Sequence, residues 1–392
     1  MRYNVSGELF VKVAIVRTTL HRGSGQVVHI RELVRKLLKM GLEVSIFCRE
    51  VEGEIDLPNI YLAKFFFDKL LFIRHFGFAF EAGLMAQDFD IIHTQYHPDI
   101  FAGNVSHFLK SKAHVFTFHG FTPATVWRNP RQMIKMVDHQ IGTAIALRLG
   151  VDQVIAVSDF LKRELVQFYR FDAEKVNVIY NGIDTQKFNP EIDGLKIRGK
   201  YGVGSNPLVL FLGRLAPYKG PQFLIMAAPQ ILKEVPDAKF VIAGSGRHEI
   251  PQLKILVKKL NLEKAFIFTG YVTDWEIPYL YASCDVFCYP SLWEGFGLTP
   301  AEAQACGKPV VAFNISAIPE VVKNRETGIL VPPKDYTKLA PAIIQLLSDK
   351  KAREKMGHKG RQRVLRLFSW DNVAKETIKV YQKALELQGR RT

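Results

Sequence analysis

The sequence predicts an α/β protein that contains two doubly wound domains. Short β-branched runs alternate with helical patterns from end to end, which indicates βαβ units and parallel sheets. The length of 392 residues exceeds what one hydrophobic core commonly holds. A polar segment near the middle separates the alternation into two sets, so each set is expected to form its own domain.

The predicted strands are short apolar runs flanked by turn residues. In the first half they are Val11–Val16, Val44–Phe47, Asp90–His93, His114–Phe118, Gln153–Val157 and Val176–Ile179. In the second half they are Leu208–Leu212, Lys239–Ala243, Ala265–Thr269, Asp285–Tyr289, Pro309–Phe313 and Ile329–Val331. In open sheets of this kind, ligands bind beyond the carboxyl ends of the strands, so the loops that follow these runs are the candidate sites.

The domain boundaries follow from the polar stretch Asn181–Gly194, which contains Asn-Gly, Asn-Pro and Asp-Gly dipeptides. We therefore expect one domain at 1–190 and a second at 191–369. Residues 370–392 form a helical pattern that Ser369 can cap, and we expect this terminal helix to pack back on the N-terminal domain.

Composition favours a globular protein with an anionic ligand. Hydrophobic residues make up 48% and charged residues 23% of the chain. Of the net charge of +15, the first 192 residues carry +3 and the remainder +12. This balance suits a nucleoside diphosphate, an acidic membrane or nucleic acid without choosing among them. Because no nucleic-acid recognition motif is present, we expect no nucleic-acid partner.

Cysteine usage and hydropathy predict a cytoplasmic location. The four cysteines (Cys48, Cys284, Cys288 and Cys306) are too few for a disulfide framework and are expected to be buried thiols in a reducing compartment. Polar residues interrupt the N-terminal stretch, so no secretory signal is expected. No apolar run is long enough for a transmembrane helix.

The segment from Pro290 to Glu302 is the most informative part of the chain. It follows an apolar strand and is expected to open a helix at Pro300. Gly295 and Gly297 allow backbone amides to approach a ligand, and a helix N-terminus favours an anion. Glu294 and Glu302 can accept hydrogen bonds from sugar hydroxyls. Two structural alternatives remain: Glu302 forms a capping box with Thr299, and Glu294 is an ordinary loop carboxylate.

This segment resembles the Glu-x7-Glu signature of glycosyltransferase family 4, and further similarities extend over nearly the whole chain. Similar to that family, the second domain opens with Phe211-Leu212-Gly213-Arg214 followed by Lys219. The glycine turn Ala243-Gly244-Ser245-Gly246, the strand end Gly270-Tyr271-Val272 and the junction tetrapeptide Asn181-Gly182-Ile183-Asp184 follow the family order. The resemblance implies the GT-B fold, in which two Rossmann-like domains face a central cleft.

By position, the resemblance implies a role for each residue of the donor site. The pyrophosphate of a nucleotide sugar would lie against Arg214 and Lys219, and both side chains are common phosphate partners. The ribose would donate to Glu302 and the transferred sugar to Glu294. The remaining donor-binding residues are expected to be Gly25, Gly244, Val272, Gly295, Phe296, Gly297 and Leu298, the last three through backbone amides.

In the first domain, two features lie at expected strand ends. Gly23-Ser24-Gly25 precedes a helix that begins near Gln26, and it is either a loop that meets the donor or acceptor or a plain turn. His119 follows the strand His114–Phe118 and, from the resemblance, would contact the donor sugar. Ser158 is expected to cap the helix Asp159–Tyr169 and to be structural.

The implied reaction is sugar transfer with retention of configuration and without a metal or cofactor. Metal-binding Asp-x-Asp motifs follow an apolar strand, whereas the Asp88-Phe89-Asp90 triplet precedes the apolar run Ile91-Ile92. We find no other cluster of possible metal ligands in the sequence. We expect a front-face displacement in which the departing diphosphate, most simply UDP, accepts the acceptor proton. Two alternatives are a dinucleotide-dependent oxidoreductase, which Val28 at the third glycine position disfavours, and a non-catalytic sugar-nucleotide-binding protein.

The sequence leaves the acceptor open among a lipid, a glycan and a small molecule. Lys64–Phe80 and Phe121–Gly150 combine aromatic, apolar and basic residues. They are either faces for peripheral contact with an anionic membrane, at its inner face, or buried helices.

Overall fold

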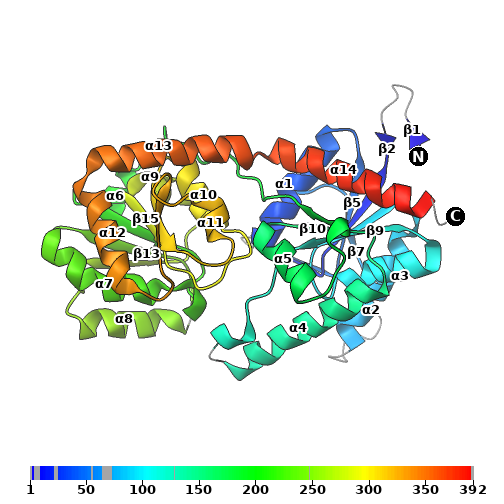
Figure 1. Ribbon diagram of the computed structural model, residues 1–392, viewed down its shortest axis with the longest axis horizontal. Coiled ribbons are helices and arrows are strands. Elements are labelled where there is room, and N and C mark those ends of the chain that lie inside the picture. The colour runs from blue at the N-terminus through cyan, green and yellow to red at the C-terminus, as the bar shows by residue number, and fades with distance from the viewer. Residues whose placement is uncertain are drawn as a thin grey trace. The chain divides into compact units, whose positions relative to one another are not determined.

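The computed structural model describes residues 2–3, 9–21, 25–53, 56–63, 73–127, 129–246 and 248–389 (Figure 1). The chain forms two compact units. The first unit contains Met1–Ala124, Arg131–Gly182 and Trp370–Thr392, and the second contains Thr125–Pro130 and Ile183–Ser369.

The first unit is centred on a seven-stranded sheet in which every neighbouring pair is parallel. Its order is β11-β10-β9-β8-β3-β5-β7. The bounds are β3 (Lys12–Val16), β5 (Glu43–Cys48), β7 (Ile60–Leu62), β8 (Ile91–Thr94), β9 (Ala113–Phe118), β10 (Gln153–Ala156) and β11 (Val176–Val178). Two small ribbons accompany it, β1 (Arg2–Tyr3) with β2 (Leu9–Phe10) and β4 (Thr19–His21) with β6 (Glu50–Glu52).

The helices of the first unit connect and cover these strands. They are α1 (Gly25–Lys39), α2 (Ile73–Met85), α3 (Ile100–Lys110), α4 (Pro130–Leu149), α5 (Asp159–Gln167) and α14 (Trp370–Gly389), with short 3₁₀ turns η1 (Ala86–Asp88), η2 (Ala124–Val126) and η3 (Ala173–Lys175). The Ser158 hydroxyl accepts from the Leu161 amide at 3.1 Å, which confirms its predicted role as the cap of α5.

The terminal helix α14 is part of the first unit's core. Trp370, Val373 and Tyr381 are buried in one hydrophobic cluster with residues of β3, β5 and α1. Figure 1 shows α14 running alongside α1, although more than 300 residues separate them in sequence. The C-terminal segment therefore completes a domain that the N-terminal segment begins.

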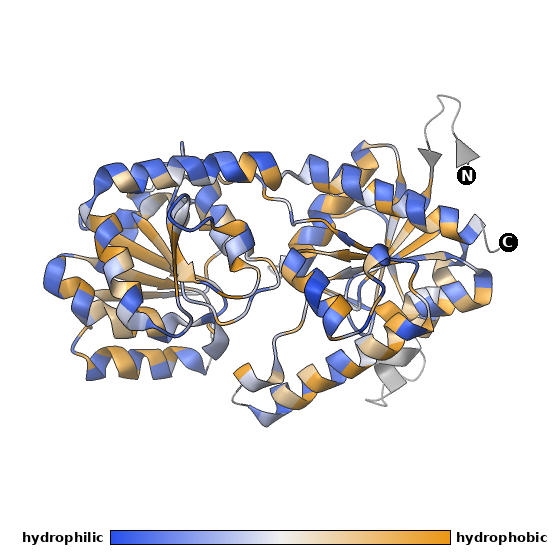
Figure 2. Cartoon of the chain, in the orientation of Figure 1, coloured by the Kyte–Doolittle hydropathy of each residue, from blue (hydrophilic) through white to orange (hydrophobic). Residues whose placement is uncertain are grey.

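The second unit contains a six-stranded parallel sheet in the order β14-β13-β12-β15-β16-β17. The bounds are β12 (Leu208–Leu212), β13 (Lys239–Ala243), β14 (Phe266–Gly270), β15 (Val286–Tyr289), β16 (Val310–Phe313) and β17 (Gly328–Val331). The chain first adds β13 and β14 on one side of β12 and then β15, β16 and β17 on the other, so the topological switch point lies between β12 and β15. In Figure 2 the strands of this sheet are coloured mainly as hydrophobic, as expected for a sheet that is covered on both faces.

Helices follow nearly every strand of the second unit. They are α6 (Leu195–Lys200), α7 (Pro221–Glu234), α8 (Glu249–Lys259), α9 (Ile277–Ser283), α10 (Leu298–Ala305), α11 (Ile318–Val321), α12 (Tyr336–Ser348) and α13 (Lys350–Leu367), with the 3₁₀ turn η4 (Pro217–Lys219).

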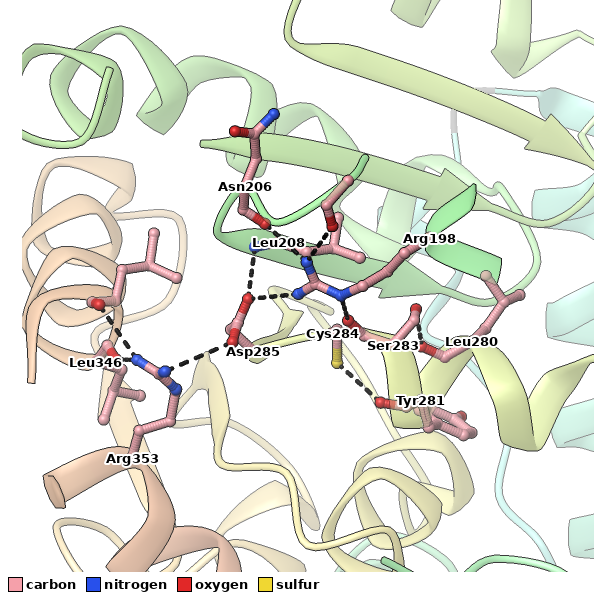
Figure 3. Close-up of polar contacts among 12 residues, drawn as sticks. Arg198, Asn206, Leu208, Leu280, Tyr281, Ser283, Cys284, Asp285, Leu346 and Arg353 are labelled. Carbon is pink, nitrogen blue, oxygen red and sulfur yellow. Dashed lines mark hydrogen bonds and ion pairs between the residues drawn. The ribbon is translucent and has the colours of Figure 1, made fainter. Parts of the chain in front are cut away.

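A charged network ties these elements together at the amino ends of the strands (Figure 3). Asp285, which precedes β15, accepts hydrogen bonds from the Arg198 guanidinium and the Leu208 amide, each at 2.8 Å. Arg353 of α13 lies 3.5 Å from the other carboxylate oxygen and also donates to the Leu346 carbonyl at 2.9 Å. Since this edge is opposite to the ligand-binding edge of a parallel sheet, we assign these residues a structural role.

The predicted strands all occur, with small shifts at their ends. Helix α10 begins at Leu298 and not at Pro300, because the positive φ of 110° at Gly297 ends the preceding loop there. All four cysteines are buried and free, as expected. Among the described residues, none of the helices has the length and apolar character needed to cross a bilayer. Residues 64–72 of the proposed aromatic segment lie outside the described residues.

Candidate active site

The candidate donor site of the second unit lies at the switch point between β12 and β15. These two strands are parallel neighbours, with Leu210 opposite Phe287. Gly213 and Arg214 directly follow β12, and the Pro290–Gly297 loop directly follows β15. The parallel sheet therefore brings together the two loops that the sequence analysis had singled out.

An ion pair between Lys219 and Glu294 connects these loops. The Lys219 ammonium lies 2.6 Å from Glu294 Oε1 and donates to Tyr289 Oη at 2.9 Å. The same carboxylate oxygen accepts hydrogen bonds from Tyr289 Oη at 2.9 Å and from Ser291 Oγ at 2.7 Å. Both charged side chains are largely buried, with 16% of Lys219 and 10% of Glu294 exposed. Glu294 is therefore not an ordinary solvated loop carboxylate.

The surroundings keep Lys219 charged. Burial of the ammonium lowers the pKa of Lys219, but the Glu294 carboxylate and the Tyr289 and Tyr218 hydroxyls favour the charged form more strongly. The resulting pKa lies well above the ordinary value for lysine. A permanently charged ammonium at a loop junction can hold an anion in place of, or in addition to, its carboxylate partner.

Arg214 supplies a second permanent cation at the same edge. Its guanidinium donates to Tyr218 Oη at 2.6 Å. Burial of the guanidinium lowers the pKa of Arg214, while Tyr218 and Glu294 raise it, and the net shift is upward. Tyr218 and Lys219 both belong to η4. This single turn therefore contacts the Arg214 guanidinium through Tyr218 and supplies the second cation, Lys219.

Close backbone packing holds the strand ends at this edge. Gly244 follows β13 with φ of 135°, and a Cβ atom there would lie 1.9 Å from the carbonyl oxygen of Gly213. The Gly213 amide in turn donates to the Ala243 carbonyl at 3.0 Å. Glycine at 244 is therefore required for the loops after β12 and β13 to lie side by side. Val272, two residues past β14, is buried.

Glu302 lies on the second turn of α10, where its carboxylate accepts a hydrogen bond from Tyr281 Oη at 2.8 Å. The capping-box alternative is wrong, because the N-cap is Gly297 and no side chain caps this helix. Burial raises the pKa of Glu302 to about 7, and the Tyr281 hydrogen bond lowers it in part. A carboxyl group held this way is partly protonated near neutral pH.

The N-terminus of α10 offers the backbone amides that were expected at Phe296, Gly297 and Leu298. The Phe296 side chain is buried and packs against Phe368, with ring centroids 5.2 Å apart. Gly297 is the N-cap and Leu298 the first helical residue. The first amides of a helix have no partner within it, so this turn can donate to an anion or a sugar.

In the first unit, His119 follows β9, as predicted. Its Nε2 lies 3.0 Å from Gln95 Oε1, and its ring lies edge-on to His29 with centroids 5.0 Å apart. Gly25 is the first residue of α1, whereas Gly23 and Ser24 lie outside the described residues.

Two groups of possible metal ligands in the first unit can be compared with the sequence interpretation, which the first supports and the second corrects. The rejected Asp88-Phe89-Asp90 triplet is structural, since Asp90 accepts from the Lys12 amide at 2.9 Å. The expectation of no other ligand cluster is wrong: possible ligand atoms of His97, Asp138 and His139 lie within 4.8 Å of one another. The sequence did not reveal this group because His97 lies in the loop after β8, whereas Asp138 and His139 belong to α4.

Comparisons with known proteins agree with this geometry. Residues 195–363 match the family described as glycosyl transferases group 1, and residues 23–187 match glycosyltransferase family 4. An uncharacterised glycosyltransferase of Methanocaldococcus jannaschii is 38% identical over 242 residues, which are 61% of this chain and 62% of that protein. Alpha-maltose-1-phosphate synthase of Mycobacterium tuberculosis is 30% identical over 75% of this chain and 79% of its own length.

The fold has close counterparts among solved structures. HepE of Anabaena, in complex with UDP and glucose, superposes with a TM-score of 0.80 at 22% identity, covering 95% of this chain and 99% of that chain. Two Rossmann-like domains with parallel sheets and a basic switch-point site define a glycosyltransferase of the GT-B fold. The chain belongs to glycosyltransferase family 4, in agreement with the motif resemblance.

Proposed function

We propose that this glycosyltransferase transfers a sugar from a UDP-linked donor to a lipid, glycan or small-molecule acceptor with retention of configuration. The observation that carries the proposal is the buried Lys219–Glu294 pair at the switch point, next to Arg214 and the N-terminus of α10. The UDP in the complex of the Anabaena protein supports the choice of nucleotide. The second unit would bind the donor and the first unit the acceptor.

The two cations would bind the donor diphosphate. An incoming diphosphate would compete with Glu294 for the Lys219 ammonium, which stays protonated at any physiological pH. Arg214 would add a forked donor, and the amides of Phe296, Gly297 and Leu298 at the N-terminus of α10 would add uncharged ones. Gly25 would meet the donor from the first unit, and Gly244, Val272 and Gly295 would line the site in the second.

Glu294 would orient the transferred sugar. Its Oε1 atom already receives the contacts from Lys219, Tyr289 and Ser291. None of the hydrogen bonds that Glu294 makes among the described residues uses the second carboxylate oxygen, Oε2, which would accept from sugar hydroxyls. Glu302 would accept in the same way from the ribose, in place of or beside the Tyr281 hydroxyl.

The reaction would be a front-face displacement. The bond between the anomeric carbon and the diphosphate oxygen breaks, and the electron pair leaves with the diphosphate. The acceptor oxygen then bonds to the anomeric carbon from the same face, and its proton passes to the departing diphosphate oxygen. Lys219 and Arg214 stabilise the charge that develops on the leaving group, an effect worth roughly 3–4 kcal/mol per contact in comparable sites.

Nucleotide binding and release test this proposal. Calorimetry should detect UDP binding with chelator present, and UDP-sugars should release UDP when acceptors are supplied. Arg214→Ala and Lys219→Ala should each lower turnover about 100-fold or more, whereas Lys258→Ala, an exposed lysine on α8, should not. Loss of UDP binding on chelation would contradict metal independence and implicate a site such as His97, Asp138 and His139. Reduction of a nicotinamide cofactor, or binding without turnover, would favour the alternative functions.

We propose further that α4 docks on an anionic membrane at the cytoplasmic face. Ile134, Val137, Ile141, Ile145 and Leu149 recur every three or four residues and are all exposed, Ile134 to 70% and Ile141 to 57%. Such spacing places them on one face of the helix, and hydrophobic segments alternate along α4 in Figure 2. The exposed charges on α4 are three basic residues and one acidic residue (Arg131, Lys135, Arg148 and Asp138). An apolar face flanked by positive charge fits an acidic lipid surface.

Sedimentation with lipid vesicles tests this surface. The protein should bind vesicles that contain phosphatidylglycerol and bind pure phosphatidylcholine weakly. The double change Ile141→Glu and Ile145→Glu should reduce binding roughly 100-fold, because two apolar side chains no longer enter the interface. Ile255→Glu, at an isoleucine of α8 that is 68% exposed, is the matched control. Unchanged binding of the double variant would exclude α4 as the docking surface.

A further inference from the structure

A chain of buried polar side chains connects His119 to the interior of the first unit. Gln95 directly follows β8, and its amide lies between two histidines. Gln95 Oε1 is 3.0 Å from His119 Nε2, and Gln95 Nε2 is 3.0 Å from His93 Nε2. His93 Nδ1 is 2.7 Å from Tyr381 Oη on α14. Gln95, His93 and Tyr381 are all fully or almost fully buried.

The chemistry of the amide assigns the protons along this chain. A carbonyl oxygen only accepts, so His119 must donate through an Nε2–H group to Gln95 Oε1. The Gln95 NH₂ group only donates, so His93 Nε2 must carry a lone pair. The Thr117 hydroxyl, 2.7 Å from the same nitrogen, can donate to it as well. His93 then holds its proton on Nδ1 and donates it to Tyr381 Oη.

We propose that Gln95 and His93 are positioning residues that hold His119 in the Nε2–H tautomer, so that its Nδ1 atom accepts a hydrogen bond from a donor-sugar hydroxyl. The described residues supply no hydrogen-bond partner for Nδ1 of His119. The identity of the hydroxyl rests on the proposed function, whereas the tautomer does not. Each residue of the chain fixes the proton of the next, and the buried end at Tyr381 prevents water from competing.

The groups that face His119 also keep its ring neutral. Burial lowers the pKa of His119 well below the ordinary value, and the neighbouring His29, Arg17 and His93 lower it further. His29 comes from α1, Arg17 follows β3, and His93 is on β8. Among the described residues, no carboxylate contributes to this shift. A neutral ring retains the Nδ1 lone pair across the physiological pH range, and protonation would convert that acceptor into a donor.

The tautomer can be measured in the free protein. Long-range ¹H–¹⁵N spectra of ¹⁵N-histidine-labelled enzyme separate protonated from unprotonated ring nitrogens, and the spectrum of His119→Gln identifies the His119 signals. We expect His119 to show a proton on Nε2 alone from pH 6 to pH 8. Gln95→Leu should give a mixture of tautomers. A proton on Nδ1 in the unmodified enzyme, or an unchanged tautomer in Gln95→Leu, would overturn the proposal.

Two substitutions at Gln95 separate positioning from simple structural support. Gln95→Glu keeps an acceptor for the Nε2–H group but adds a negative charge, which raises the pKa of His119. Its kcat should be near normal at pH 8.5 and fall about 10-fold per pH unit below that pKa. Gln95→Leu should lose about 10-fold in kcat at every pH, with the affinity for UDP nearly unchanged. A pH profile of Gln95→Glu that runs parallel to that of the parent would overturn the positioning role, even if UDP-sugar turnover is established.

Discussion

The environment of Glu302 allows a prediction in which stability and ligand binding change in opposite directions. The half-buried carboxyl group has a pKa raised from 4.5 to about 7 by burial, partly offset by the Tyr281 hydrogen bond. Above pH 7 the folded protein therefore keeps a carboxylate in a place that favours the neutral acid. We expect Glu302→Gln to stabilise the second unit at pH 8 while it weakens UDP binding.

The shift fixes the sign and the scale of the effect. The folded protein holds this proton more tightly than the unfolded chain, so its contribution to stability is complete below pH 4.5 and disappears as the pH rises through 7. A shift of this size corresponds to about 3 kcal/mol at pH 8. Because the side chain is only half-buried, this value is an upper bound. Glutamine keeps the shape without titrating, so it should remove this pH dependence.

The effect on the ligand has the opposite sign. A ribose hydroxyl donates more strongly to a carboxylate than to an amide oxygen, and a hydrogen bond to a charged group contributes about 1.5–3 kcal/mol. Glu302→Gln should therefore weaken UDP binding roughly 10-fold at pH 8, and Glu302→Ala should weaken it more. In the parent protein, UDP affinity should decline as the pH falls from 8 to 6, because the carboxylate becomes protonated.

Urea unfolding at pH 5.5 and 8.5, together with UDP calorimetry at both pH values, measures the two effects. Glu263→Gln changes an exposed glutamate of the same unit and serves as the control. A Glu302→Gln variant with the same pH dependence of unfolding as the parent would refute the argument from burial. Unchanged UDP affinity in both Glu302 variants would assign the residue to the scaffold.

Three further changes test other parts of the second unit. Glu294→Gln should reduce kcat roughly 100-fold or more while calorimetry finds UDP affinity within a few-fold of the parent; an equal loss of affinity would place the residue at the nucleotide instead of the sugar. Asp285→Ala should lower the free energy of unfolding by about 2 kcal/mol without affecting UDP binding, since it leaves two guanidinium groups without their carboxylate; denaturant titration checks this. Gly244→Ala should destabilise the unit by at least about 3 kcal/mol, because φ of 135° and a contact of 1.9 Å with a backbone carbonyl exclude a methyl group. Gly199→Ala, at a helical position with open space around it, should be neutral or stabilising in the same assay.

Much of the fold could be predicted because its determinants are local. The alternation of β-branched runs and helical patterns located twelve of the thirteen strands of the two large sheets and omitted only β7 (Ile60–Leu62). The omitted strand is only three residues long, and because Tyr61 and Leu62 are exposed it has no alternation of buried and exposed positions to identify it. The short ribbons of the first unit were missed because their strands are only two or three residues long.

The helical face of α4 shows where local patterns are ambiguous. Apolar residues at helical spacing usually mark a buried face, and the sequence could not decide between burial and a docking surface for Phe121–Gly150. In the structure, Met136, His139 and Leu147 face inward, while Ile134 and Ile141 are exposed. When a helix is apolar on two faces, the sequence pattern does not indicate which face is buried. The packing of neighbouring elements determines which face of α4 is covered.

The sequence by itself determined the fold class, the family and the order of the site motifs, because glycine turns, strand runs and the Glu294-to-Glu302 spacing are each encoded by contiguous residues. Only the tertiary structure decided which of these residues meet. The pairing of Lys219 with Glu294, of Glu302 with Tyr281, and of His119 with Gln95 joins residues that are 75, 21 and 24 positions apart. These contacts depend on strand order and on which chain ends lie at one edge of a sheet. Such an arrangement is a property of the packed sheet as a whole, and no single stretch of sequence encodes it.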